Sequence, residues 1–344
     1  MTDPAAVGEA RRRSAVPPRI AVVVPCYRAA ATVGAVLAGI GPEVSRIFVV
    51  DDACPEGTGT RLSEASSDPR LTILWNERNL GVGGAVKRGY RAALADGADI
   101  VVKIDADGQM DPAHIGRLVA PVAAGEADYA KGNRFARRFL IPSASGRRRG
   151  GDMPAGRRFA NNLASFLHKG VTGQWGIVDP ANGFNAIHRR ALEAIDLDAA
   201  ADCYFFETDM LFQLGLADAV VKDVPLPAAY AGEVSSLRVR NVLGRFPVLA
   251  LRRFAKRIAV RYFLNDFNVA SLEIVIGLPL LVFGTLLGLF HWADAVRSGV
   301  PASAGTVMFA ALPIILGFQL LLSAVSYDVS RRPTEPLSRR PPPE

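Results

Sequence analysis

Cysteine is scarce in this 344-residue sequence: Cys26, Cys54 and Cys203 stand far apart, outside any CxxC pair or Cys/His cluster. The spacing provides neither a disulfide framework nor a zinc site, and it is typical of reduced thiols in the cytosol. A long apolar run is also missing from the first residues. We therefore expect no signal peptide there, and a disordered basic arm over residues 1–18.

Several ligand-binding patterns are absent as well. The stretch GVGGAV at 81–86 fits neither the P-loop nor the GxGxxG pattern. The acidic stretch KIDADGQMDP at 103–112 fails as an EF-hand calcium loop, because position 6 is Met110 and position 12 is Gly116. Aromatic residues do not alternate with the basic ones, which argues against nucleic acid as the partner. The net charge of +7 must therefore serve another anionic partner, such as a phosphate-rich substrate or an acidic membrane.

Short apolar runs alternate with helical patterns through the first part of the chain. Four such runs, at 20–25, 47–52, 71–76 and 99–107, are predicted strands. Strands that alternate with helices predict a doubly wound, mostly parallel α/β sheet, in which ligands bind beyond the carboxyl ends of the strands.

Polar residues follow three of these predicted strands. Pro25, the pair Asp51–Asp52, and the Asp105-x-Asp107 motif should therefore share one rim of the sheet. Asp105, Asp107 and the nearby Gln109 provide the oxygen ligands that Mg²⁺ or Mn²⁺ prefers, and diphosphate oxygens would complete the shell. The pattern predicts a metal–nucleotide site.

The C-terminal part has the composition of a membrane segment. Residues 242–264 read as a basic amphipathic helix, and the stretches 274–290 and 302–327 contain no charged residue. Two buried core helices are the alternative. Arginines flank the pair of spans on both sides, while the loop between them holds only Arg297, so the positive-inside rule places the large domain in the cytosol, at an inner or plasma membrane.

The motifs VVVPCYRAAATV, VVDDACPEGT, NERNLGVGGAVKRGY, KIDADGQMDP and KGNRF, in this order, resemble family-2 glycosyltransferases with the GT-A fold over roughly residues 19–236. With two C-terminal spans, the chain resembles the polyprenyl-phosphate glycosyltransferases, the dolichol-phosphate mannosyltransferase type. The resemblance implies inverting, metal-dependent transfer of a sugar from a UDP- or GDP-sugar to polyprenyl phosphate at the cytosolic membrane face.

The resemblance also assigns roles to individual residues. It implies nucleotide-sugar contacts at Pro25, Tyr27, Val50, Asp52, Asp105, Ala106, Asp107, Gln109 and Arg134. It implies catalytic roles for Asp107, Arg134 and Asp209, and metal ligands at Asp105, Asp107 and Gln109. Candidate contacts to the acceptor phosphate are Arg157, Arg158, Arg238 and Arg240. Arg28 and Ala29 replace the usual Asn-Glu, which leaves the nucleobase open.

The expected organisation is an N-terminal arm (1–18), a GT-A domain (19–236) with a mobile arginine-rich loop (137–158), a juxtamembrane segment (237–268), two transmembrane helices (269–328) and a cytosolic tail (329–344). A polysaccharide or glycolipid acceptor is one alternative, although the QxxRW motif of processive synthases is missing. A membrane protein that binds nucleotide sugars without activity is another. Homo-oligomerisation stays open.

Overall fold

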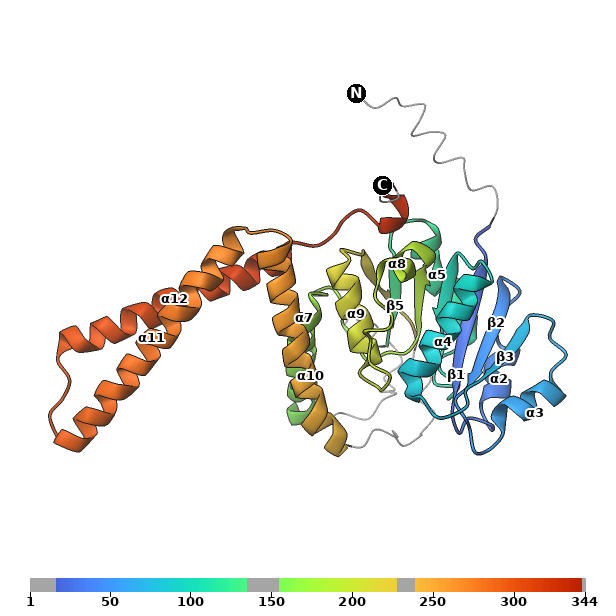
Figure 1. The fold of residues 1–344 in the computed structure, drawn as a ribbon, viewed down its shortest axis with the longest axis horizontal. Coiled ribbons are helices and arrows are strands. Elements are labelled where there is room, and N and C mark those ends of the chain that lie inside the picture. The colour runs from blue at the N-terminus through green and yellow to red at the C-terminus, as the bar shows by residue number, and fades with distance from the viewer. Residues whose placement is uncertain (1–16, 135–154, 228–238, 342–344) are drawn as a thin grey trace, which may run out of the picture. The chain divides into compact units, whose positions relative to one another are not determined.

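The computed structural model describes residues 17–134, 155–227 and 239–341, with the backbone alone at 155–162 and 239–243 (Figure 1). The chain divides into two compact units. The first comprises residues 1–247 together with 334–344, and the second comprises residues 248–333.

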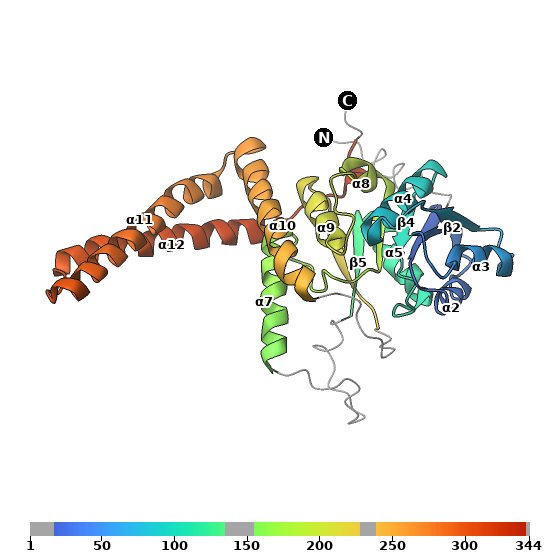
Figure 2. The same cartoon turned by 60° about the horizontal axis from the view of Figure 1, so that its bottom comes forward.

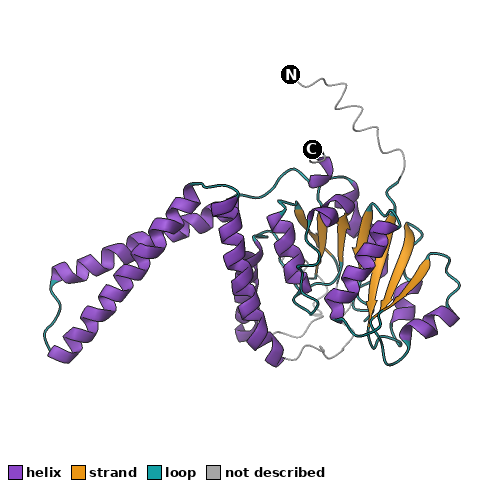
Figure 3. Cartoon of the chain, in the orientation of Figure 1, coloured by secondary structure: helices purple, strands orange, loops and turns teal. Residues whose placement is uncertain are grey.

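A seven-stranded sheet forms the centre of the first unit (Figure 3). Its strands are β1 (Ile20–Cys26), β2 (Val44–Asp51), β3 (Leu71–Trp75), β4 (Ile100–Lys103), β5 (Tyr129–Asn133), β6 (Asn185–His188) and β7 (Val221–Pro225). The order is β3-β2-β1-β4-β6-β5-β7, and β6 runs antiparallel to both of its neighbours while the other pairs are parallel. The mostly parallel α/β fold is confirmed.

Helices cover both faces of this sheet (Figure 2). One face packs against α2 (Val33–Ala38), α3 (Thr58–Ala65), the 3₁₀ turn η1 (Pro112–His114) and α5 (Ile115–Ala123). The other face packs against α4 (Gly81–Ala95), α8 (Arg189–Ala194) and α9 (Phe206–Leu216), and α7 (Ala155–Thr172) packs on α9. Burial on both faces explains why the strands are continuously apolar rather than alternating.

The four strands predicted from apolar runs are all present, although β4 ends at Lys103, before the Asp-x-Asp motif. Strand β5 and helix α3 were not predicted. Strand β5 reads YAKGN, and its central lysine and glycine hide the apolar pattern of a buried strand. The predicted loop 137–158 overlaps α7, which begins at Ala155; the rest of that loop lies outside the described residues.

The second unit contains the end of α10 (Val239–Ala259), the π-helix η2 (Val260–Leu264), α11 (Val269–Ser298) and α12 (Ala304–Ser330). Helices α11 and α12 pack as a hairpin at glycines: a Cβ at Gly317 would come within 2.6 Å of the Leu281 backbone. Both helices are long and apolar enough to cross a membrane. Only 11% and 17% of their most apolar windows are buried, whereas a core helix of a soluble protein is mostly buried.

The described part of the tail folds back onto the first unit and includes η3 (Leu337–Arg339). The buried Asp128 carboxylate accepts hydrogen bonds from the backbone N–H groups of Leu337 (2.9 Å), Ser338 (3.1 Å) and Val220 (2.9 Å). The structure thus divides the chain differently from the predicted scheme, in which residues 329–344 form a separate tail.

Candidate active site

The strand register brings the predicted site loops to one edge of the sheet. Cys26 of β1 pairs with Asp51 of β2, and Val23 of β1 pairs with Lys103 of β4. Since these strands are parallel, the loops that follow them all leave from their carboxyl ends. The rim predicted from the sequence is therefore present.

Tyr27 is the exposed residue of the loop after β1, with 45% of its surface accessible. The Arg28 guanidinium lies 5.5 Å from the centre of the Tyr27 ring. Arg28 has a φ of 54°, and its N–H donates to Cys54 Sγ at 3.1 Å, which ties this loop to the loop after β2. Pro25, at the end of β1, is half-buried. An exposed aromatic ring beside a cation can receive a nucleobase or ribose.

Asp52 occupies a buried position under the rim. Its carboxylate accepts hydrogen bonds from the backbone N–H groups of Leu80 and Gly81, each at 2.8 Å, and from the Asn76 amide at 2.6 Å. These bonds satisfy the N–H groups at the start of α4 and anchor that helix. Val50 is fully buried, so its side chain does not face the rim. The predicted nucleotide contacts at Asp52 and Val50 stay predictions, and the structure gives both residues a structural role.

The loop with the Asp-x-Asp motif is held at three points. The Thr32 hydroxyl donates to the carbonyl of the buried Ala106 at 2.6 Å, and Asp107 Oδ1 accepts from the Gln109 N–H at 3.0 Å. Asp111 caps η1 by accepting from Ala113 N–H at 2.9 Å. Asp107 and Gln109 are both half-buried at the rim.

These residues suit a hard divalent cation in part. Asp105, Asp107 and Gln109 offer oxygen donors, which Mg²⁺ and Mn²⁺ prefer. Within the described part of the chain, no group of three His, Cys, Asp or Glu side chains is arranged to hold a metal. One oxygen of Asp105 also pairs with an ammonium, described next. The protein alone therefore supplies few ligands, and substrate oxygens and water would have to supply the others.

A cluster of buried charges lies beneath the motif. Lys103 Nζ contacts Asp105 Oδ1 at 2.9 Å and Glu207 Oε1 at 2.7 Å, and Lys131 Nζ contacts Glu207 Oε2 at 2.8 Å. We call Lys103, Lys131 and Glu207 the lysine–glutamate cluster. Burial would raise the pKa of Glu207, but the two lysine charges outweigh it and lower that pKa to about 2. Burial would lower the pKa of Lys103, and the charges of Asp105 and Glu207 raise it instead.

Arg134 lies at the end of β5, where it forms a bidentate pair with Asp179: Nε–Oδ2 is 2.7 Å and Nη2–Oδ1 is 3.0 Å. Asp179 is buried. Asp223 lies nearby and accepts a hydrogen bond from the Asn133 amide. Burial raises the pKa of Asp223 to about 6, despite that hydrogen bond. The predicted residue Arg134 thus has its guanidinium oriented by the buried carboxylate of Asp179.

Asp209 is fully buried in α9, and its Oδ2 accepts from the Ala201 N–H at 2.8 Å. Its predicted catalytic role stays a prediction. The acidic residue of α9 that meets the motif is Glu207, which the sequence analysis missed. A lysine at position 103 within the apolar run IVVKI was the available signal, because a lysine in a central strand needs a buried partner.

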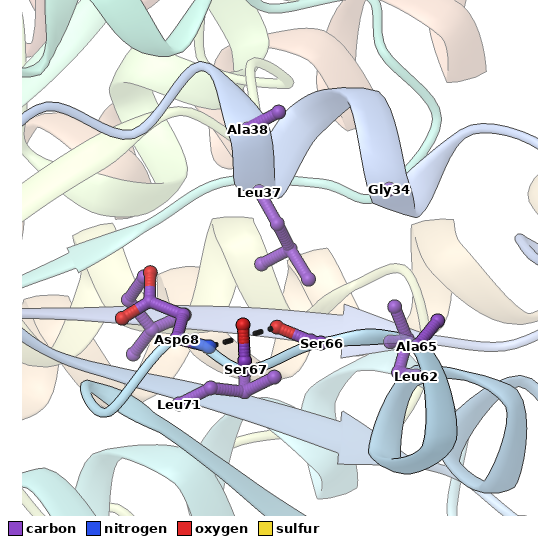
Figure 4. A pocket seen from close by; sticks show the side chains of 10 residues that line it. Gly34, Leu37, Ala38, Leu62, Ala65, Ser66, Ser67, Asp68 and Leu71 are labelled. Atoms are coloured by element: carbon purple, nitrogen blue, oxygen red, sulfur yellow. Dashed lines mark hydrogen bonds between the residues drawn. The ribbon is translucent and has the colours of Figure 1, made fainter.

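The side chains of Arg157, Arg158, Arg238 and Arg240 lie outside the described part of the structure, so the predicted contacts to the acceptor phosphate stay predictions. A separate groove of about 520 Å³ opens between α2 and α3. Figure 4 shows Leu37 above it and Leu62, Ser66 and Asp68 below. Its lining includes no residue of the predicted site.

The fold and the rim describe a sugar-transferring enzyme of the GT-A type. The model of the family "Glycosyl transferase family 2" matches residues 21–196, which are 176 of the 344 residues. The chain belongs to this family and is a glycosyltransferase.

Two relatives share 31% identity with the chain. The undecaprenyl-phosphate mannosyltransferase of Micrococcus luteus aligns over 215 residues, or 60% of this chain and 82% of the relative. The polyprenol monophosphomannose synthase of Mycolicibacterium smegmatis aligns over 214 residues, or 60% of this chain and 76% of the relative.

A solved structure supports the fold alone. Glucosyl-3-phosphoglycerate synthase from Mycobacterium tuberculosis, in complex with Mn²⁺, UDP-glucose and phosphoglyceric acid, has a TM-score of 0.51 and 22% identity. The match covers 74% of this chain and 85% of that chain.

Proposed function

We propose that this glycosyltransferase transfers a sugar from a nucleotide sugar to polyprenyl phosphate at the cytosolic face of a membrane, with inversion. The observation that carries the proposal is the pair of largely unburied apolar helices on a family-2 domain, since relatives of that domain are mannosyltransferases of undecaprenyl phosphate and polyprenol phosphate. Residues 1–247 and 334–344 belong to one unit, so the chain enters the helical hairpin from this unit and returns to it. The flanking arginines support the cytosolic side.

The rim residues offer contacts to the nucleotide-sugar donor. Tyr27 offers a ring for the base or ribose, and Asp107 with Gln109 would hold a Mg²⁺ or Mn²⁺ ion on the diphosphate. The bound ion would offset charge on the departing nucleoside diphosphate. Arg134, oriented by Asp179, adds a second positive charge for the same oxygens.

The acceptor explains why a dedicated base is not required. A polyprenyl phosphate is anionic near neutral pH, so its oxygen attacks the anomeric carbon directly. The bond from the anomeric carbon to the diphosphate breaks as the bond to the lipid phosphate forms. Catalysis then rests on positioning and charge stabilisation.

The full chain in detergent, given labelled GDP-mannose, UDP-glucose or UDP-N-acetylglucosamine with undecaprenyl phosphate and Mn²⁺ or Mg²⁺, tests this proposal. We expect labelled lipid with one donor, and mannose is the first sugar to try because both 31% relatives transfer it. Asp111→Asn is the matched control, since Asp111 only caps η1. If the chain binds nucleotide sugars but forms no labelled lipid with any donor, the proposal that polyprenyl phosphate is the acceptor is wrong.

A further inference from the structure

Three polar side chains form a row across the centre of one face of the sheet. The register pairs Lys103 of β4 with Asn185 of β6, and Asn185 with Lys131 of β5. Directly paired residues point to the same face of a sheet, so all three point towards α4 and α9. The preceding residues on that face, Val101 and Tyr129, belong to the apolar core.

Glu207, in the first turn of α9, completes this row. Its two carboxylate oxygens each accept from one of the lysines, at 2.7 and 2.8 Å. Lys103 is 2% exposed and Lys131 is fully buried. Buried ions are stable only when each has its partner, so Glu207 fixes the position of both ammonium groups.

The row reaches the donor site through Asp105. Lys103 Nζ holds Asp105 Oδ1, and the Gly183 backbone lies against the other oxygen, where a Cβ would come within 1.9 Å of Oδ2. Asn185 holds the same turn by donating to the Gly183 carbonyl at 3.1 Å. The Asp105 carboxylate is therefore confined between an ammonium group and a glycine.

We propose that Glu207 is a positioning residue for the donor site: it holds Lys103 and Lys131 under the sheet rim, and Lys103 in turn fixes and neutralises the carboxylate of Asp105. The inference rests on the proposed function, in which this rim binds a nucleotide sugar. It assigns a role to three residues that form no part of the rim itself.

The pairing of Lys103 with Asp105 lowers the negative charge that a donor diphosphate would meet at the rim. A donor diphosphate is strongly anionic, and two unpaired carboxylates at Asp105 and Asp107 would repel it unless a cation intervened. With Lys103 paired to Asp105, the metal has to offset only Asp107 and the diphosphate. The cluster also prevents Asp105 from rotating away from the rim.

Binding of the nucleoside diphosphate tests this role without the lipid acceptor. Titration calorimetry of UDP and GDP, with and without Mn²⁺, would compare the wild-type chain with Glu207→Gln and Lys103→Met. We expect each variant to bind at least tenfold more weakly and to show a donor KM raised by a similar factor, with kcat changed less. Wild-type affinity in both variants would overturn the proposal.

A double variant separates positioning from stability. Lys103→Met with Glu207→Gln leaves one buried ammonium group, that of Lys131, without its carboxylate, whereas Glu207→Gln alone leaves two, so the thermal midpoint of the double variant should recover relative to Glu207→Gln. Its nucleotide affinity should stay at least tenfold low, because Asp105 has lost Lys103. Recovery of both properties together would show a purely structural cluster and would overturn the proposal.

Asp128→Asn provides the matched control for lost stability. Asp128 is fully buried and the Glu207 side chain is only 13% exposed, but Asp128 precedes β5 and so lies at the amino ends of the parallel strands, away from the rim. We expect it to lower the thermal midpoint and leave nucleotide affinity unchanged. If the wild-type chain binds nucleotide but does not glycosylate undecaprenyl phosphate, only the proposed acceptor is wrong. If it binds no nucleotide, both the proposed function and the role of Glu207 are wrong.

Discussion

Charge is buried in both units of the molecule, and the two clusters differ in what they connect to. In the first unit, the lysine–glutamate cluster contacts Asp105 and through it the donor rim. In the second unit, Arg257 pairs with Asp328 at 2.7 Å, and the Tyr262 hydroxyl donates to the same carboxylate. This second cluster joins the end of α10 and η2 to α12. One cluster supports a site, and the other fastens helices.

Arg257 belongs to the stretch that was predicted to be a basic amphipathic helix, a type of helix suited to an anionic membrane. Arg257 is 2% exposed, however, and its charge is offset by Asp328. The exposed basic residues of that stretch, Arg245, Arg252 and Lys256, are the ones available to lipid headgroups. Helical spacing indicates that basic residues share a region of the helix, but it does not identify the one whose partner lies on a distant helix.

Removal of one buried partner should give the largest effect in either cluster. We expect Glu207→Ala and Asp328→Ala each to lower the free energy of unfolding by about 3–5 kcal/mol, because uncompensated cations stay buried. Thermal unfolding of the full chain in detergent measures this. Among the molecules that stay folded, only those of Glu207→Ala should bind nucleotide more weakly than wild type. Equal weakening in Asp328→Ala would contradict the difference in role between the two clusters.

A third buried charge, Asp128, is satisfied by backbone N–H groups instead of a cation. Asp128→Asn should cost about 2–3 kcal/mol, since charged hydrogen bonds to the tail and to Val220 are lost. The tail should then be cleaved faster by protease near residues 334–341. A variant as stable and as resistant to protease as wild type would show that the contact between Asp128 and the tail does not stabilise the protein.

The stability of the first unit should depend on pH through the buried His168. Burial, with the nearby charge of Lys131, lowers the pKa of His168 from its ordinary 6.5 to about 4. Between these values the unfolded chain binds the extra proton, so His168 contributes a fall in the free energy of unfolding of about 2 kcal/mol or more as pH falls from 6.5 towards 4, which the raised pKa of Asp223 opposes. His168→Gln should remove this contribution, so its Tm should fall less towards pH 4 than that of wild type. An unchanged curve would contradict the burial of a neutral imidazole.

Replacement of the whole second cluster should have the smallest effect. Arg257→Met, Asp328→Leu and Tyr262→Phe together leave no buried charge, so stability should change by only about 1 kcal/mol. Donor KM should stay at the wild-type value, in contrast to the lysine–glutamate double variant. A raised donor KM in the triple variant would show that this cluster also serves the site.

Local patterns predicted the rim well. Strand ends followed by Pro25, Asp51, Asp52 and Asp105 were enough, because parallel strands bring their carboxyl ends to one edge. The antiparallel insertion of β6 between β4 and β5 was not predictable from these patterns, and it is what aligns Lys103, Asn185 and Lys131. Glu207 was missed because the sequence does not show which acidic residue meets a buried cation, and the catalytic role of Asp209 stays a prediction.

We propose above that Asp107 at this rim serves sugar transfer to a lipid phosphate. The most direct test compares wild-type chain, Asp107→Asn and Asp111→Asn for formation of labelled lipid from the active nucleotide sugar and undecaprenyl phosphate. The account predicts metal-dependent product with wild type and Asp111→Asn, and at least a hundredfold less with a folded, membrane-inserted Asp107→Asn. Full activity in Asp107→Asn would contradict it.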